Sequence, residues 1–144
     1  MKNKKNLNFF IPSTDNNLDT ILINAGISAG FPSPAGDFKQ ERISLDQELI
    51  KNKEATFFAR VSGESMINAG LEDGDLIVID RSIEPINNKI AVCFIEGEFT
   101  VKRLIVKKNK IWLKPENSSY KPIEVNDDDQ LIIWGIVTNV IKKL

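Results

Sequence analysis

The sequence predicts a mostly β, largely antiparallel domain with short helices, preceded by a flexible N-terminal arm. Two observations support this prediction. From Arg42 onward, most apolar residues fall in short runs of β-branched and aromatic residues, separated by turn-forming residues. The first 30 residues are instead rich in Asn, Ser and Thr. At 144 residues with 42% hydrophobic residues, the chain has the size of one domain with a core of its own.

The arm allows two local structures. Apolar residues recur at helical spacing behind the capping candidates Thr14 and Asp15, which favours a short amphipathic helix. These residues are Leu18, Ile21, Leu22 and Ala25. The run Ile21–Ile23 would pair equally well as a strand. Further on, Pro32 and Pro34 disfavour helical backbone, so residues 31–36 are expected to be extended and exposed.

One short helix and six strands are expected beyond the arm. The run Ser44-Leu45-Asp46-Gln47 resembles a capping box and opens a helix that ends near Ile50. The Glu96-Gly97 turn joins two of the strands at hairpin spacing. Further turns are expected at 72–75 and 107–110. The strands are Thr56–Val61, Leu76–Asp80, Ile90–Ile95, Glu98–Val106, Ile111–Leu113 and Leu131–Ile141.

Composition argues against several classes of function. The net charge is −1, with 19 basic and 20 acidic residues, so the chain lacks the electrostatic footprint of a direct DNA-binding protein. The single cysteine, Cys93, lies in an apolar run and is expected to be a buried thiol in a reducing compartment. Without histidine or a second cysteine, we expect no metal and no cofactor. No stretch has the length of a signal peptide or membrane span, so the cytoplasm is the expected location.

Serine chemistry without histidine is the candidate activity. Because the chain contains no histidine, a serine nucleophile needs another base, and lysine serves when it is held neutral. Ser65 follows Gly63 and precedes a candidate helical turn, whose free N–H groups would stabilise an oxyanion. Lys102 lies mid-strand and would need a pKa well below the usual value of about 10.4. The alternatives are a helix-capping Ser65 and an exposed Lys102 that protects a sheet edge.

The arm also contains a candidate substrate. Ala29-Gly30 offers almost no side chain, so its peptide bond would lie flat in an extended groove, and the nearby prolines keep the segment extended. Taken alone, this dipeptide carries little information.

Three motifs together resemble the UmuD branch of the LexA-type self-cleaving peptidases. They are the run from Gly30 to Ala35, the segment Ser62–Ile67 with Gly74-Asp75-Leu76, and the strand Gly97–Lys102. They occur in the family's order and approximate spacing, and the resemblance covers roughly residues 26–141. It implies a compact fold similar to the LexA C-terminal domain.

The resemblance also implies the roles of single residues. Ser65 would be the nucleophile and Lys102 the general base, and the backbone N–H groups of Ser65 and Glu64 would hold the oxyanion. The chain would cut itself between Ala29 and Gly30, as the repressors of this family do, whereas UmuD proteins often carry Cys-Gly there. Residues 1–29 would then be the removed arm, and residues 30–144 the peptidase and dimerisation domain.

In function, the resemblance implies a homodimer of the SOS response to DNA damage. A RecA filament on single-stranded DNA would induce the self-cleavage, and the product would join a UmuC-like, Y-family translesion polymerase in error-prone synthesis. About 30 residues precede the expected cut, too few for the DNA-reading helix-turn-helix domain of a LexA repressor. Two alternatives stay open: a non-catalytic dimeric scaffold, and a LexA-like phage repressor fragment that regulates transcription. Signal peptidase also uses a Ser-Lys pair, but no membrane anchor is expected here.

Overall fold

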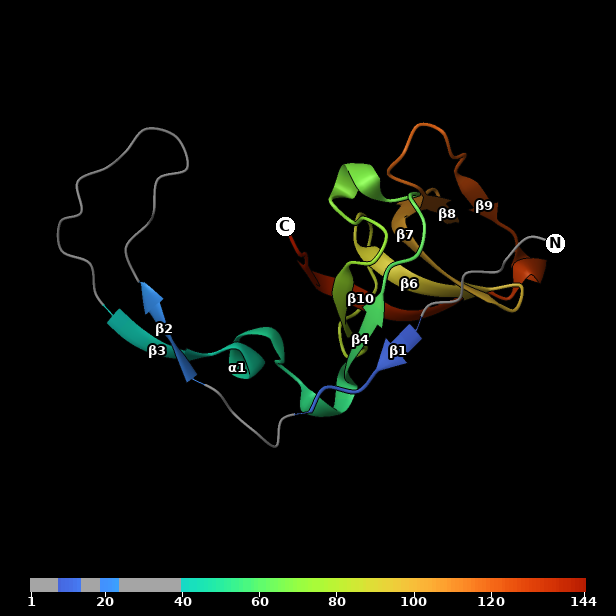
Figure 1. The fold of residues 1–144 in the computed structure, drawn as a ribbon. Coiled ribbons are helices and arrows are strands. Elements are labelled where there is room, and N and C mark those ends of the chain that lie inside the picture. The colour runs from blue at the N-terminus through green and yellow to red at the C-terminus, as the bar shows by residue number, and fades with distance from the viewer. Residues whose placement is uncertain (1–7, 14–18, 24–39) are drawn as a thin grey trace. The chain divides into compact units, whose positions relative to one another are not determined.

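The fold is seen in a computed structural model that describes residues 8–13, 19–23 and 40–144 (Figure 1). The chain divides into two units, one formed by residues 1–12 and 52–144, the other by residues 13–51. Strands dominate both units, and every strand pair is antiparallel. The predicted mostly β, antiparallel fold is therefore confirmed.

The smaller unit pairs β2 (Asp19–Ile23) with β3 (Gln40–Ser44), and α1 (Leu45–Leu49) follows directly. The Ser44 side chain caps α1 by accepting the Gln47 N–H at 3.5 Å, which confirms the predicted helix. The strand alternative for Ile21–Ile23 is confirmed, and the helix alternative is wrong there, because β3 offers a pairing edge. The predicted extended stretch 31–36 lies outside the described residues.

The larger unit is an eight-stranded sheet in the order β1-β4-β5-β10-β6-β7-β8-β9. All six predicted strands are present, and each predicted boundary lies within a few residues of the observed one. Two further strands, β1 and β9, were not predicted, since three residues are too few to show a periodicity. The strands are β1 (Asn8–Phe10), β4 (Thr56–Arg60), β5 (Leu76–Asp80), β6 (Ile90–Ile95), β7 (Glu98–Lys107), β8 (Lys110–Lys114), β9 (Ile123–Val125) and β10 (Ile132–Ile141).

Short 3₁₀ turns complete this unit. They are η1 (Lys53–Ala55), η2 (Ile67–Ala69) and η3 (Asp127–Asp129). Among the described residues, no helix is long and apolar enough to span a membrane.

The core joins the two regions that the sequence analysis singled out. Met66 and Leu71 come from the loop after β4, and Val101 comes from β7. All three pack in one buried cluster with side chains of β4, β5 and β6. Burial of this shared cluster therefore holds the segment around Ser65 against the strand that carries Lys102.

A β-bulge in β10 shapes the centre of the sheet. Where β10 pairs with β6, the register shifts between Ile133 and Gly135, so Trp134 is the extra residue. The Trp134 ring packs against Phe9 and Phe57, with ring centroids 4.7 and 5.0 Å away. The Arg81 guanidinium lies 4.5 Å above the same ring. The bulge thus directs one aromatic side chain toward its partners on β1 and β4.

Gly135 is required by the close approach of β5. A Cβ at this position would lie 2.5 Å from Cγ2 of Ile79, a fully buried side chain. We therefore predict that Gly135→Ala lowers the free energy of unfolding by about 1–3 kcal/mol, the usual cost of overpacking. Urea denaturation measures this change.

The matched control removes the clashing atom. In Ile79→Ala/Gly135→Ala the added methyl group has room, so the double variant should lose less stability than the two single variants together. A Gly135→Ala chain as stable as the wild type would contradict the proposed clash.

Candidate active site

Ser65 and Lys102, 37 residues apart in sequence, meet in the structure. The Lys102 Nζ lies 3.0 Å from the Ser65 Oγ, within hydrogen-bonding distance. Ser65 belongs to the turn between β4 and η2, and Lys102 to the middle of β7. The two elements come together because their neighbours Met66 and Val101 share a buried cluster.

The turn that carries Ser65 is fixed from several sides. Gly63 has a φ of +93°, a left-handed conformation that favours glycine, and its N–H donates to a carboxylate oxygen of Asp73 at 2.7 Å. The Asn117 side-chain amide donates to the Glu64 carbonyl at 2.8 Å. Met66 is only 2% exposed. These contacts hold the serine in place on both sides along the chain.

Ser65 is not a helix cap. The N-cap residue of η2 is Met66, and η2 has no side-chain cap. The capping alternative from the sequence is therefore wrong, and the Ser65 hydroxyl is directed to Lys102.

Lys102 is a buried residue of an interior strand. The residue is 8% exposed, and β7 lies between β6 and β8. The alternative of an exposed lysine at a sheet edge is therefore wrong. Burial disfavours the charged ammonium and lowers the pKa of Lys102, against a smaller opposing effect of the Cys93 thiol.

Cys93 provides no permanent counter-charge for the lysine. It is fully buried, as the sequence predicted, and burial raises the pKa of its thiol to about 12. The thiol is therefore neutral near pH 7. A neutral neighbour does not stabilise the ammonium, so the desolvation of Lys102 stays largely uncompensated.

Three oxygen atoms surround the Lys102 Nζ. Besides Ser65 Oγ, they are Thr100 Oγ1 at 2.7 Å and the Val101 carbonyl oxygen at 3.1 Å. An ammonium donates one hydrogen to each. A neutral amine has two hydrogens and a lone pair, and the carbonyl can only accept. If Thr100 takes the second hydrogen, the lone pair is left for the Ser65 O–H.

The backbone N–H groups of Glu64 and Ser65 lie next to the serine hydroxyl in the chain. Within the described parts of the chain, neither group donates a hydrogen bond to the protein. The preceding N–H, that of Gly63, is occupied by Asp73. Two adjacent donors beside a serine hydroxyl are the arrangement that an oxyanion requires.

The Ser-Lys pair opens onto two adjoining cavities of about 210 and 510 Å³. Both cavities are lined by Phe99, Thr100, Lys102 and Tyr120, so they adjoin at these residues. The first also contains the 61–66 turn, and the second extends past Glu98 toward Lys121.

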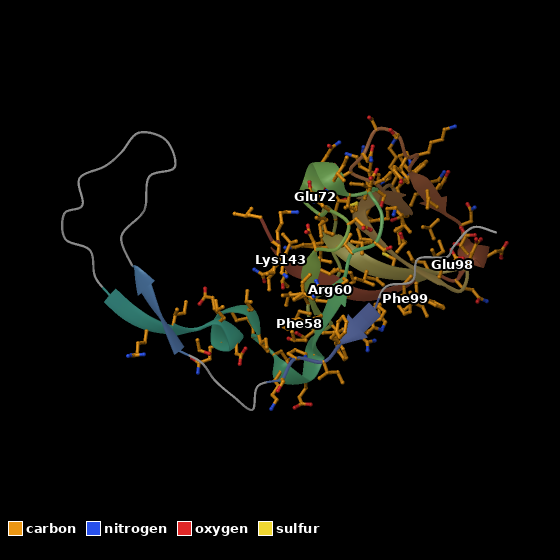
Figure 2. The ribbon with its side chains drawn as sticks, viewed as in Figure 1. Phe58, Arg60, Glu72, Glu98, Phe99 and Lys143 are labelled. Atoms are coloured by element: carbon orange, nitrogen blue, oxygen red, sulfur yellow. The ribbon has the colours of Figure 1, made fainter. Side chains whose placement is uncertain are left out.

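Sequence reasoning did not identify Phe99 or Tyr120 as site residues. Phe99 is part of the strand motif, where its apolar character indicates only a strand position, and Tyr120 lies in a polar loop without a pattern. Figure 2 shows Phe99 near the start of β7, close to β1. Ala29 and Gly30, the predicted cleavage site, lie outside the described residues.

Comparisons with known proteins assign the chain to a peptidase family. Residues 21–138 match the family model described as Peptidase S24-like. The chain is 39% identical to protein ImpA of Salmonella typhimurium over 132 residues, 92% of this chain and 90% of that protein. It is 40% identical to protein MucA of Escherichia coli over 114 residues, 78% and 77% of the two chains.

A third relative has a longer chain. The LexA repressor of Clostridium kluyveri is 43% identical over 101 residues, which cover 70% of this chain and 50% of that protein. The chain therefore belongs to the S24 peptidase family, and within it to the UmuD-like members of the LexA/UmuD group, whose function is related to the SOS response.

Proposed function

We propose that this chain is a self-cleaving serine peptidase that cuts its own Ala29-Gly30 bond. The observation that carries the proposal is the 3.0 Å contact between Ser65 Oγ and a buried Lys102 Nζ, in a chain without histidine. The family assignment supports the same reaction class. In this proposal Ser65 is the nucleophile and Lys102 the general base.

The reaction follows from these roles. The neutral Lys102 amine takes the Ser65 hydroxyl proton while Oγ attacks the Ala29 carbonyl carbon. The resulting oxyanion accepts hydrogen bonds from the N–H groups of Glu64 and Ser65. The Lys102 ammonium then gives its proton to the departing Gly30 nitrogen, which leaves an Ala29 ester on Ser65. Water, deprotonated by Lys102, attacks this ester, the acyl–Oγ bond breaks, and Lys102 returns the proton to Ser65 Oγ as residues 1–29 are released.

Regulation acts on how often the arm occupies the groove. A substrate on the same chain makes the cut unimolecular, so a weakly bound arm still reacts when it reaches the site in the right geometry. A RecA filament on single-stranded DNA would raise the population of the arm-docked state, which is a population shift and needs no new catalytic group.

The product, residues 30–144, would act in the cytoplasm as a homodimer. Its role would be that of the accessory subunit of a UmuC-like, Y-family translesion polymerase, since the chain belongs to the UmuD-like proteins. No metal or cofactor takes part in this proposal. If the cleavage experiment below fails, the non-catalytic scaffold and the repressor fragment become the leading alternatives.

Self-cleavage can be measured as intact mass over time, at rising pH and with RecA, nucleotide and single-stranded DNA. We expect two fragments cut between Ala29 and Gly30, at a rate that rises with pH because Lys102 loses its proton. Ser65→Ala and Lys102→Ala should slow the cut by on the order of 10³-fold or more. The exposed Lys107 of the same strand provides the control Lys107→Ala, which should cut at the wild-type rate. A wild-type chain that stays whole under both conditions contradicts the proposal.

Thr100 is expected to act as a positioning residue for Lys102. Its hydroxyl accepts an N–H from Nζ, and such a bond is stronger to the charged amine, so it favours the ammonium. Thr100→Val should therefore shift the pH profile of self-cleavage toward lower pH and reduce its plateau rate roughly tenfold, because the amine loses one orienting partner. Thr100→Ser keeps the hydroxyl and should restore both. An unshifted profile in Thr100→Val would disprove this role.

The buried lysine should also make stability depend on pH. Since folding lowers the Lys102 pKa, the unfolded chain binds more protons between the folded and unfolded pKa values, and stability rises with pH there. In a Ser65→Ala background, the free energy of unfolding relative to Lys102→Met should therefore rise as pH approaches the usual lysine value. Below the folded pKa both states bind the proton, so the difference should level off there. Urea denaturation at several pH values measures this difference.

Lys107→Met in the same Ser65→Ala background is the control. Because Lys107 is exposed, it measures how pH affects the stability change of a lysine-to-methionine substitution without burial. A stability difference between Ser65→Ala and Ser65→Ala/Lys102→Met that is flat with pH would mean that burial does not disfavour the ammonium.

A further inference from the structure

The N-terminal strand β1 forms one edge of the large sheet. Asn8, Phe9 and Phe10 pair with Arg60, Ala59 and Phe58 of β4. In the strand order of the sheet, β4 has β5 on its other side, so β4 would be the edge strand without β1. β1 therefore pairs with the backbone N–H and C=O groups along the edge of β4, and another extended segment could pair with the same groups.

One side chain anchors β1. Phe9 packs against the core, with its ring centroid 4.9 Å from Phe99 and 4.7 Å from Trp134. The neighbouring Phe10 points to the other face of the sheet and is 47% exposed. Phe9 thus fills a site bordered by aromatic side chains from β7 and β10, next to Phe57 of β4.

β1 lies on the removable side of the proposed cut, because residues 1–29 contain it. Within one chain, a tethered segment faces its site at an effective concentration on the order of 1 mM, so a strand with a Kd of about 0.1 mM would be docked about nine times in ten. After the cut, the same strand at about 1 µM would be docked roughly once in a hundred. Three paired residues and one anchor fit such a weak contact.

We propose that β1 is a removable cover and that the site beneath it is a docking site for a partner protein. The occupant is an extended segment that adds to β4 as an antiparallel strand and inserts an aromatic side chain where Phe9 lies. This mode of binding combines main-chain hydrogen bonds with one side-chain pocket. Exposure of the site rests on the proposed self-cleavage, since the cut turns β1 from a tethered segment into a dilute peptide.

The probe for this site is a fluorescent synthetic peptide with the sequence of residues 1–13, and fluorescence anisotropy measures its binding. We expect the self-cleaved protein to bind it at least tenfold more tightly than the uncut Ser65→Ala chain, in which β1 competes. A Phe9→Ala peptide should lose at least tenfold in affinity. A Phe10→Ala peptide should stay within about threefold, because Phe10 makes none of the ring contacts of Phe9.

A full-length chain tests the site without any cleavage. The uncut Ser65→Ala/Phe9→Ala chain has lost the anchor of its cover, so it should bind the wild-type peptide about as tightly as the cleaved protein. Ser65→Ala/Phe10→Ala is the matched control and should bind as weakly as Ser65→Ala alone. Failure of self-cleavage would overturn the proposed function and the release of the cover. The comparison of Ser65→Ala/Phe9→Ala with Ser65→Ala/Phe10→Ala would still decide whether the docking site exists.

Three results would overturn the proposal. The first is co-elution, in gel filtration at micromolar concentration, of equal amounts of residues 1–29 and residues 30–144. The cover would then stay in place after the cut. Another is a peptide that binds neither the cleaved protein nor the Ser65→Ala/Phe9→Ala chain. The third is a cleaved protein that excludes the peptide and forms a larger oligomer than the uncut chain, which would make a second copy the occupant of the β4 edge.

Discussion

The arrangement of the site centres on a lysine amine that is buried beside a serine hydroxyl. Removing an ammonium from water costs free energy, and no carboxylate among the described residues lies against Lys102 to repay it. The three oxygen atoms around Nζ satisfy its hydrogen bonds in either protonation state. The cluster of Met66, Leu71 and Val101 supplies the packing that keeps the turn and the strand together at this cost. Burial at this position therefore costs stability and lowers the pKa of Lys102, which is what the proposed role as a base requires.

The aromatic residues connect this site with the N-terminal segment. Phe99 lines the groove next to Lys102 and also packs against Phe9. Trp134, set by the bulge of β10, touches the same Phe9 ring. The strand that would be lost by self-cleavage therefore borders the groove in which we propose that the cut takes place. The cut between Ala29 and Gly30 would therefore also uncover the edge of β4.

Much of the fold could be predicted from the sequence because its signals are local. Short runs of β-branched and aromatic residues mark the six longer strands, and Ser44 with Gln47 marks α1. The pairing of β2 with β3 could not be predicted, because Gln40–Ser44 is mostly polar and gains its strand structure from its partner. The three-residue strands β1 and β9 depend on neighbours that are distant in sequence. The bulge at Trp134 arises where β10 meets β6, so the sequence of β10 alone does not reveal it.

By itself, the sequence determined the residue types that the chemistry requires: a serine after a glycine turn, a lysine in a β-strand and no histidine. It did not decide whether Ser65 and Lys102 meet, or whether they are a capping serine and an exposed lysine, since each segment fits both. Only the tertiary structure showed that they meet, because burial and a 3.0 Å distance are properties of segments brought together across 37 residues. Desolvation acts on a side chain through everything that surrounds it, and most of what surrounds Lys102 comes from other strands.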